Sequence, residues 1–267
     1  MENRDSHTTK ASLLLTAVAL IMLLLTPGVS WAERPMTGEG EWKSRCPKIS
    51  KNPMVYGVGS STMGTSLGAS LSKALKQEGV KFRKWGKASS GLARPEFHDW
   101  PKSIRQVVRQ KNPDIFVISL GTNDFQALYH KKKWIRLKEE KRWKEIYRQR
   151  VESALEAASG REGKRMVVWI TPTIFNSKKA IRAGKWIHDI VLEEAKHFGG
   201  PVFVVDAYGR TTKGGQPLQF FKTKGGKKLS IFGKDKIHLT QSAVDHLMAD
   251  PVMEIIRPCL PQKKSAQ

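Results

Sequence analysis

Cysteine is scarce in this sequence of 267 residues, which contains only Cys46 and Cys259. No CxxC pair and no paired-histidine spacing is present, so the sequence gives a zinc site little support, and we expect neither a metal nor a cofactor. Each cysteine lies close to one end of the region that follows the apolar N-terminal run. In an oxidising compartment, a disulfide that ties these two ends together is the natural pairing.

Acidic residues are also few. Asp and Glu together number 24 against 47 Lys and Arg, which gives a formal net charge of +23. A field of this sign attracts polyanions. Nucleic acid is the usual partner of a basic domain, but the export predicted below argues against it. Anionic envelope polymers and anionic membrane surfaces fit better as partners, and the alternative is that much of the charge is only a solvated surface.

One long apolar run is present, ASLLLTAVALIMLLL at residues 11–25. Basic residues precede it, and Ser30 and Ala32 occupy the −3 and −1 positions of a signal-peptidase site. We predict a signal peptide over residues 1–32 that is cleaved after Ala32. The alternative is an uncleaved membrane anchor, although the run is shorter than the ~18 to 20 apolar residues of a typical span. Either way we expect the rest of the chain to be exported, to the periplasm or out of the cell.

The exported region suits one α/β domain with a sizeable core. Strand-like apolar runs alternate with helix-like stretches, which is typical of βαβ units and a mostly parallel sheet. The expected strands are residues 54–58, 80–85, 115–120, 166–170 and 202–205. The expected helices are residues 67–77, 104–110, 143–158, 180–198 and 240–256. We therefore predict an irregular lead-in over residues 33–51, one domain over residues 52–260 and a tail over residues 261–267.

Two segments interrupt this alternation. Residues 130–150 are basic with interleaved aromatics, and the plainest interpretation is a solvated amphipathic helix. Residues 209–234 are rich in glycine and lysine and contain two phenylalanines. A loop of that length in a compact domain is usually functional or mobile.

The stretch PMVYGVGSSTMGTS, residues 53–66, has three candidate roles at the end of the first strand. A phosphate-binding loop would need a lysine where Thr65 stands. A dinucleotide-binding turn would need its third glycine earlier than Gly64 and an acidic residue at the end of the second strand. The third role is a catalytic serine, which requires a general base and an orienting carboxylate elsewhere in the chain.

Suitable partners follow the other predicted strands. Ser89-Ser90-Gly91 comes after the second strand, Gly121-Thr122-Asn123-Asp124 after the third, and Asp235 precedes His238 by three residues near the C-terminus. Open α/β sheets place their sites at the carboxyl ends of the strands. The sequence therefore favours the serine mechanism.

These four motifs, in this order, resemble the blocks of the SGNH (GDSL) hydrolase superfamily, and SSGLARPEFHDW is similar to an exported bacterial branch of it. The resemblance covers Gly59 to His238 and implies a flavodoxin-like, three-layer α/β/α sandwich with a five-stranded sheet. It implies a catalytic triad in which Ser61 is the nucleophile, His238 the general base and Asp235 the residue that orients it. It also implies an oxyanion hole formed by the N–H groups of Ser61 and Gly91 with the Asn123 amide.

The first block departs from the family pattern because Gly59-Ser60-Ser61 replaces Gly-Asp-Ser. If Gly64 sets the frame instead of Gly59, Ser60 becomes the nucleophile; the Gly-x-Ser spacing favours Ser61. The resemblance implies an exported esterase that removes acyl groups, commonly O-acetyl, from a carbohydrate or envelope polymer through an acyl-enzyme. The alternatives are an O-acyltransferase with the same triad, a lipid esterase, and a non-catalytic glycan-binding relative.

Overall fold

A computed structural model describes residues 45–160 and 163–261. These belong to one compact unit, Glu41–Gln267. The predicted signal peptide, most of the predicted lead-in and nearly all of the predicted tail lie outside the described residues. In the described part of the chain, no helix combines the length and the apolar character needed to cross a membrane.

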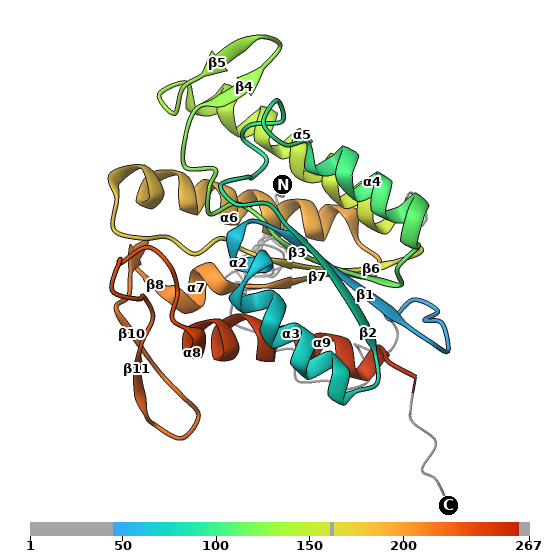
Figure 1. The fold of residues 1–267 in the computed structure, drawn as a ribbon. Helices are drawn as coiled ribbons and strands as arrows, with labels where there is room; N and C mark the ends of the chain where they lie inside the picture. Colours follow the sequence, from blue (N-terminus) through green and yellow to red (C-terminus); the bar gives the residue numbers. More distant parts are fainter. Residues whose placement is uncertain (1–44, 161–162, 262–267) are drawn as a thin grey trace, which may run out of the picture. The chain divides into compact units, whose positions relative to one another are not determined.

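The five predicted strands form one sheet in which every neighbouring pair is parallel (Figure 1). The strand order is β2-β1-β3-β6-β7. The strands are β1 (Met54–Gly59), β2 (Lys81–Gly86), β3 (Ile115–Ser119), β6 (Met166–Ile170) and β7 (Val202–Val205). The inner strands β3 and β6 are buried almost throughout because helices cover both of their faces. The prediction of a mostly parallel five-stranded sheet is therefore confirmed.

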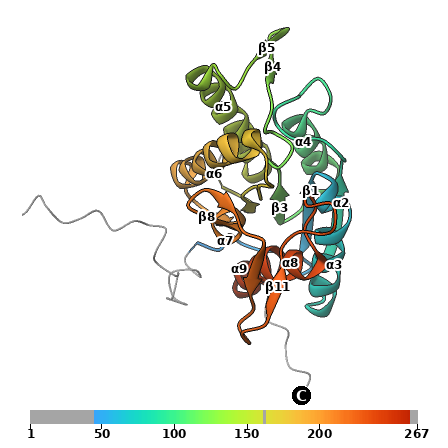
Figure 2. The same cartoon turned by 90° about the vertical axis from the view of Figure 1, so that its left-hand side faces the viewer.

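Helices cover both faces of this sheet, which gives the predicted three-layer α/β/α arrangement (Figures 1 and 2). One face carries α4 (Trp100–Lys111), α5 (Glu140–Ser159) and α6 (Lys178–Phe198) over a core rich in tryptophan and tyrosine. The other face carries α3 (Ser66–Gln77), α8 (Gln241–Val244) and α9 (Asp250–Ile256) over a core of leucine, valine and methionine. The short helix α2 (Ser61–Gly64) joins β1 to α3.

The basic segment 130–150 is not a single helix, so that interpretation was wrong. Its first part belongs to an antiparallel hairpin of β4 (Leu128–His130) and β5 (Lys133–Ile135), and its second part is the start of α5. Lys131 and Lys132 form the turn of the hairpin with φ of 47° and 62°. Such left-handed values are typical of a two-residue turn and incompatible with a continuous helix. The three consecutive lysines, Lys131 to Lys133, therefore lie at the tip of the hairpin and not on α5.

The segment 209–234 is ordered into short structures. It starts within α7 (Ala207–Thr211) and continues through two small antiparallel ribbons. One ribbon pairs β8 (Thr212–Lys213) with β9 (Gln216–Pro217), and the other pairs β10 (Phe220–Lys222) with β11 (Lys228–Ser230). This part of the chain is an insertion between the last strand of the sheet and α8.

The predicted C-terminal helix 240–256 exists but is interrupted. A π-helical turn, Asp245–Ala249, separates α8 from α9, and a 3-10 turn, Arg257–Cys259, follows α9. Pro251 lies in the first turn of α9. Because proline has no N–H and clashes with the preceding turn, a regular helix cannot run through this position. The interruption turns the chain without breaking the apolar face that packs on the sheet.

A half-buried ionic cluster connects α6 to the end of β7. His188 Nδ1 lies 3.0 Å from Asp189 Oδ1, and its Nε2 lies 3.1 Å from Asp206 Oδ1, as an ion-pair contact without hydrogen-bond alignment. Burial lowers the pKa of the imidazole, but the two carboxylates raise it more, to about 9. The cluster is therefore charged at neutral pH.

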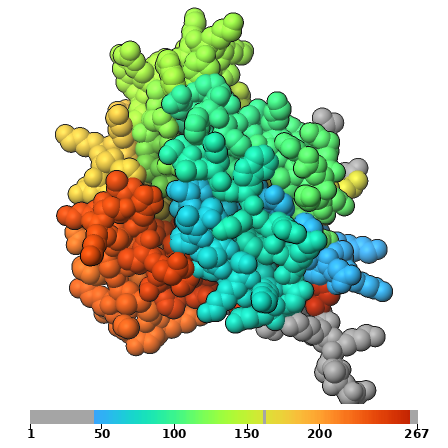
Figure 3. All heavy atoms as spheres, in the orientation of Figure 1, coloured from blue at the N-terminus to red at the C-terminus, as the bar shows by residue number. Residues whose placement is uncertain are grey.

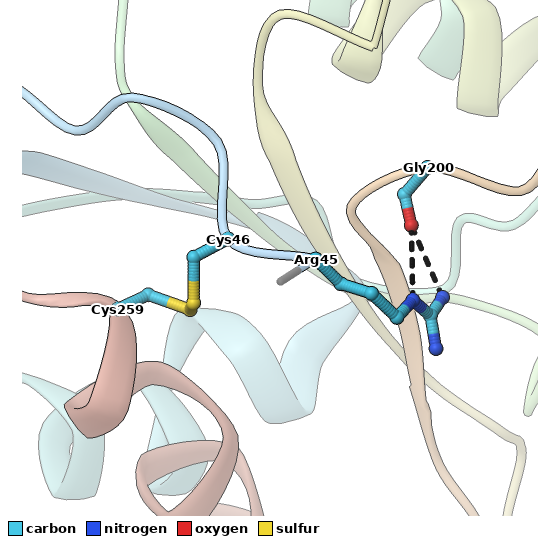
Figure 4. The surroundings of a disulfide bond; sticks show 4 residues. All are labelled: Arg45, Cys46, Gly200 and Cys259. Atoms are coloured by element: carbon cyan, nitrogen blue, oxygen red, sulfur yellow. Dashed lines mark hydrogen bonds between the residues drawn. A yellow bond between two sulfur atoms is a disulfide. The ribbon is translucent and has the colours of Figure 1, made fainter. Parts of the chain in front are cut away.

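A disulfide joins Cys46, ahead of the first strand, to Cys259, behind the last helix, with the two Cα atoms 5.4 Å apart (Figure 4). The predicted pairing is confirmed. Next to it, the Arg45 guanidinium donates hydrogen bonds to Gly200 O at 3.1 and 3.3 Å and to Val202 O at 2.8 Å. The segment before β1 is thus fixed both to the C-terminal helix and to the start of β7.

The disulfide makes a first prediction. Reduction should lower the free energy of unfolding by about 3 to 5 kcal/mol, since the bond closes a loop with a sequence separation of 213. Urea titrations with and without reductant measure the loss, and Cys46→Ser with Cys259→Ser is the matched variant. Unreduced, denatured protein should show no reactive thiol. Two thiols per chain would contradict the bond.

The His188 cluster makes a second prediction. A folded-state pKa above the unfolded value of about 6.5 contributes stability that is complete below pH 6.5 and is lost as the pH rises towards 9. We expect the stability difference between wild type and His188→Gln to fall over this window by roughly 3 kcal/mol at most. His197→Gln, at an exposed position of the same helix, is the control. A constant difference from pH 6 to 9.5 would refute the charged cluster.

Candidate active site

The first three predicted motifs lie at the carboxyl ends of three adjacent strands. The serines follow β1, Ser89-Ser90-Gly91 follows β2, and Gly121-Thr122-Asn123-Asp124 follows β3. The parallel registers pair Gly59 of β1 with Gly86 of β2 and with Ser119 of β3. The motifs are thus gathered at one edge of the sheet, where open α/β folds place their sites.

Ser61 begins α2 directly after β1. Gly59 is required at the end of the strand because a Cβ there would lie 2.5 Å from Ser119 O. Ser60 is the N-cap residue, is 5% exposed, and donates its backbone N–H to Ser119 O at 3.3 Å. Ser61 is half-buried and is the first helical residue, so its N–H has no acceptor within the helix. Of the two serines, Ser61 is the more accessible.

The predicted oxyanion residues lie close to one another. The Asn123 amide donates from Nδ2 to Ser90 O at 3.0 Å, which fixes the side chain against the loop after β2. A primary amide has a second N–H, which this bond leaves available. Ser89 has φ of 58°, so the loop turns sharply just before Ser90 and Gly91. Within the described residues, the N–H of Gly91 forms no hydrogen bond.

A buried carboxylate, Asp124, fixes the loop that carries Gly91. Asp124 is 1% exposed and accepts hydrogen bonds from the backbone N–H groups of Leu92 at 2.9 Å and Ala93 at 2.7 Å. The Tyr147 hydroxyl of α5 donates a third, at 2.9 Å. Three donors suit an ionised carboxylate, whose two oxygens act only as acceptors. A Cβ at Gly91 would overlap the Asp124 carboxylate, so only glycine allows this approach.

Arg150 of α5 binds the backbone carbonyls of the same two residues. Its Nη1 donates to Leu92 O at 2.7 Å and to Ala93 O at 2.9 Å, and its Nη2 donates to Tyr129 O. Burial raises the pKa of Asp124, and the donors and the Arg150 charge oppose that rise. Burial likewise lowers the pKa of Arg150, and the Asp124 charge opposes that change. The two charges thus hold the loop between them through its peptide groups.

Asp235 and His238 form a direct pair in the loop between β11 and α8. Asp235 Oδ2 lies 2.6 Å from His238 Nδ1, and Asp235 Oδ1 accepts from the backbone N–H groups of Ile237 and His238, each at 3.0 Å. These backbone and side-chain bonds lower the pKa of the Asp235 carboxyl to about 2. The side chain of His238 is 67% exposed. An ionised carboxylate at Nδ1 leaves Nε2 free to accept a proton.

The helix after His238 is joined to the helix after Ser61. Thr240 caps α8, and Gln241 Nε2 donates to Ser70 Oγ of α3 at 2.8 Å. The loop from β11 to α8 runs beside α2 in both ribbon views, and the two surfaces adjoin in Figure 3. In the described residues, His238 and Ser61 share no hydrogen bond. Such catalytic bonds often tighten only when substrate is bound.

Sequence reasoning therefore located two contacting pairs, Asp235 with His238 and Asn123 with the Ser90 loop. It did not find Tyr147 or Arg150, which lie in a segment interpreted as a solvated helix. The motif Gly121-Thr122-Asn123-Asp124 contains Asp124 but predicts no role for it. The one available signal was the polarity of Asp124 directly after a buried strand. In residues 45–160 and 163–261, no three His, Cys, Asp or Glu side chains cluster as metal ligands.

The Asp124 network makes a third prediction. Asp124→Asn leaves a buried N–H of the Gly91 loop unsatisfied, because an amide offers one acceptor oxygen. The free energy of unfolding should fall by about 2 kcal/mol. Tyr147→Phe, which removes only one donor, should cost about 1 kcal/mol. Urea unfolding measures both. An Asp124→Asn protein as stable as wild type would show that the carboxylate does not hold the loop.

A family profile described as "Protein of unknown function (DUF459)" matches residues 54–254. That range contains all four motifs, from Gly59 to His238. No curated protein sequence matches the chain.

Solved structures share the fold at low sequence identity. A candidate SGNH hydrolase from Slackia heliotrinireducens has a TM-score of 0.51 and 12% identity, covering 77% of this chain and 99% of that one. A candidate GDSL-like lipase from Bacteroides ovatus has a TM-score of 0.50 and 11% identity, covering 77% of this chain and 54% of that one. These likenesses show the fold, and the profile shows the family. The chain therefore belongs to the DUF459 family and shares its fold with SGNH hydrolases.

Proposed function

We propose that this protein is an exported serine esterase that removes acyl groups, chiefly O-acetyl, from an anionic carbohydrate or envelope polymer. The observation that carries the proposal is the Asp235–His238 pair at 2.6 Å, in a loop that borders the helix beginning at Ser61. The fold shared with SGNH hydrolases and the four motifs in the order of that superfamily support ester chemistry. The net charge of +23 supports an anionic substrate.

In this mechanism Ser61 Oγ attacks the ester carbonyl carbon while His238 Nε2 takes the hydroxyl proton. Asp235 holds Nδ1–H and stabilises the imidazolium that forms. The negative charge on the carbonyl oxygen is stabilised by the N–H groups of Ser61 and Gly91 and by the Asn123 amide. The imidazolium then protonates the leaving alcohol, and the acyl group remains on Ser61. Water, activated by His238, releases the acid and restores the serine.

Export is supported by two independent features. The apolar run at residues 11–25 has the flanking pattern of a signal peptide. The Cys46–Cys259 disulfide is the kind of bond that persists in oxidising compartments.

The fourth prediction tests the chemistry. Ser61→Ala should reduce hydrolysis of p-nitrophenyl acetate to near background, because the nucleophile is lost while the fold is kept. A fluorophosphonate should label Ser61 in the wild type. Ser60→Ala is the matched control at the neighbouring, buried position and should keep most of the activity.

Each other outcome has its own meaning. Activity lost only in Ser60→Ala would move the nucleophile by one residue. Full activity in both variants would exclude the serine mechanism. No activity and no labelling in the wild type would favour a non-catalytic glycan-binding relative. Transfer of the acetyl group to an added sugar in preference to water would make the enzyme an O-acyltransferase with the same triad.

A further inference from the structure

A cavity of about 460 Å³ lies against the loop that carries Asp235 and His238. Its wall includes Gly233, Lys234 and Lys236 from that loop, residues of the insertion after α7, and Asn176 from the loop after β6. The mechanism described above uses none of these side chains. The cavity therefore adjoins the candidate site without belonging to its catalytic groups.

The lining has a distinctive chemistry. Phe220 and Phe232 supply aromatic faces, Asn176 and Gln219 supply amides, and Lys234 and Lys236 supply positive charge. No acidic side chain is among the described residues that line the cavity. In the same part of the chain, neither lysine pairs with a carboxylate. A ligand for this lining would combine an apolar face, hydroxyl groups and negative charge.

Phe220 is placed as an exposed platform. It lies on β10, is 46% exposed, and has Lys228 Nζ of the partner strand 4.4 Å from its ring centre. An aromatic ring in this position presents a face to the apolar C–H groups of a sugar ring, and a nearby cation strengthens the attraction for an anionic sugar. Amide and hydroxyl groups around it match sugar hydroxyls better than an acyl chain.

One wall of the cavity is formed by the same loop that carries Asp235 and His238. Gly233 N–H donates to His238 O at 2.8 Å, Lys236 N–H donates to Gly233 O at 3.0 Å, and Phe232 pairs with Leu239 across the base of the loop. Lys236 has φ of 58°, a costly conformation for a residue with a side chain. Such strain often marks functional positions. A ligand on this wall would therefore be held at a fixed distance from the triad.

We infer that this cavity is the subsite for an anionic sugar unit of the substrate, with Phe220 as stacking platform and Lys234 as the main charge contact. The inference rests on the proposed function, because it supplies the part of the polymer that the triad does not bind. The expected substrate class is a carbohydrate that bears carboxylate or phosphate groups. An anionic membrane surface is the competing occupant.

The fifth prediction measures binding apart from catalysis, in the full-length, disulfide-bonded Ser61→Ala protein. Oligogalacturonate and a phosphorylated mannan oligosaccharide are titrated calorimetrically at low salt. Phe220→Ala with Lys234→Gln should weaken binding of at least one of them by about tenfold, as expected for one aromatic and one exposed charge contact. Lys234→Arg should retain it. Raising the salt to about 0.15 M should weaken wild-type binding, because exposed charges are then screened within ~8 Å.

The control uses the other exposed aromatic ribbon. Trp134 of β5 is 48% exposed and lies under Arg94 at 5.0 Å, beside the lysines of the β4–β5 hairpin. Trp134→Ala with Lys132→Gln therefore removes the same kinds of group from a different surface, and it should leave the affinity unchanged. Circular dichroism monitors folding. Lys234→Gln alone is a second test variant. It should not disturb folding, because Lys234 is exposed and forms no ion pair within the described residues.

Four results would overturn the subsite: neither sugar binds; the Phe220 and Lys234 changes have no effect; the hairpin control weakens binding equally; or only phosphatidylglycerol vesicles bind in a Phe220-dependent manner. Hydrolysis of p-nitrophenyl acetate by the Ser61 protein separates the two claims. Variant-sensitive sugar binding without any hydrolysis keeps the subsite and rejects the esterase. Hydrolysis without sugar binding does the reverse.

Discussion

The candidate site depends on one buried carboxylate that holds the backbone of two neighbouring residues. Asp124 takes the N–H groups of Leu92 and Ala93, and Arg150 takes their carbonyls. These bonds tie the end of β3, the loop after β2 and α5 into one unit. An isolated charge buried to this degree would be costly. The arrangement is therefore stable only as a whole, and it fixes Gly91 and Asn123 with little freedom.

The other half of the site is built differently. His238 and Asp235 are held by their own short loop and by exposed bonds between α8 and α3. The proposed general base thus lies on the less rigid side, and the predicted oxyanion donors lie on the rigid side. This division suits acyl chemistry, because the donors must be aimed before charge develops, whereas the base must move protons in two directions.

The sequence predicted the sheet well because β3, β6 and β7 are apolar on both faces and the strands follow one another in βαβ order. It predicted the C-terminal helix but not its π turn. Whether Pro251 breaks a helix or only distorts the turn before it depends on how that turn packs, which the sequence does not show. It missed the β4–β5 hairpin, since two lysines with positive φ carry none of the glycine or asparagine signal of such turns.

The parts of the candidate site that could be predicted are those whose residues lie close together in the sequence. Asp235 and His238 are three residues apart, and one turn of loop brings them together. The contact of Asn123 with the Ser90 loop joins the ends of β3 and β2, the two strands that flank β1 in the sheet. By contrast, Tyr147 reaches Asp124, and Arg150 reaches the backbone of the Gly91 loop, from a helix that begins after the hairpin, and no spacing rule connects them to the motifs. The choice between Ser60 and Ser61 also stays a prediction, because both follow the same strand.

The Cys46–Cys259 bond has a mechanical consequence. It connects the chain just before the first strand to the chain just after the last helix, across a Cα separation of 5.4 Å. Tension applied to the segments outside the two cysteines would pass through the sulfur atoms and would bypass all five strands. A domain tethered at one end and pulled at the other would therefore resist extension, and reduction of this single bond would make the sheet bear the load.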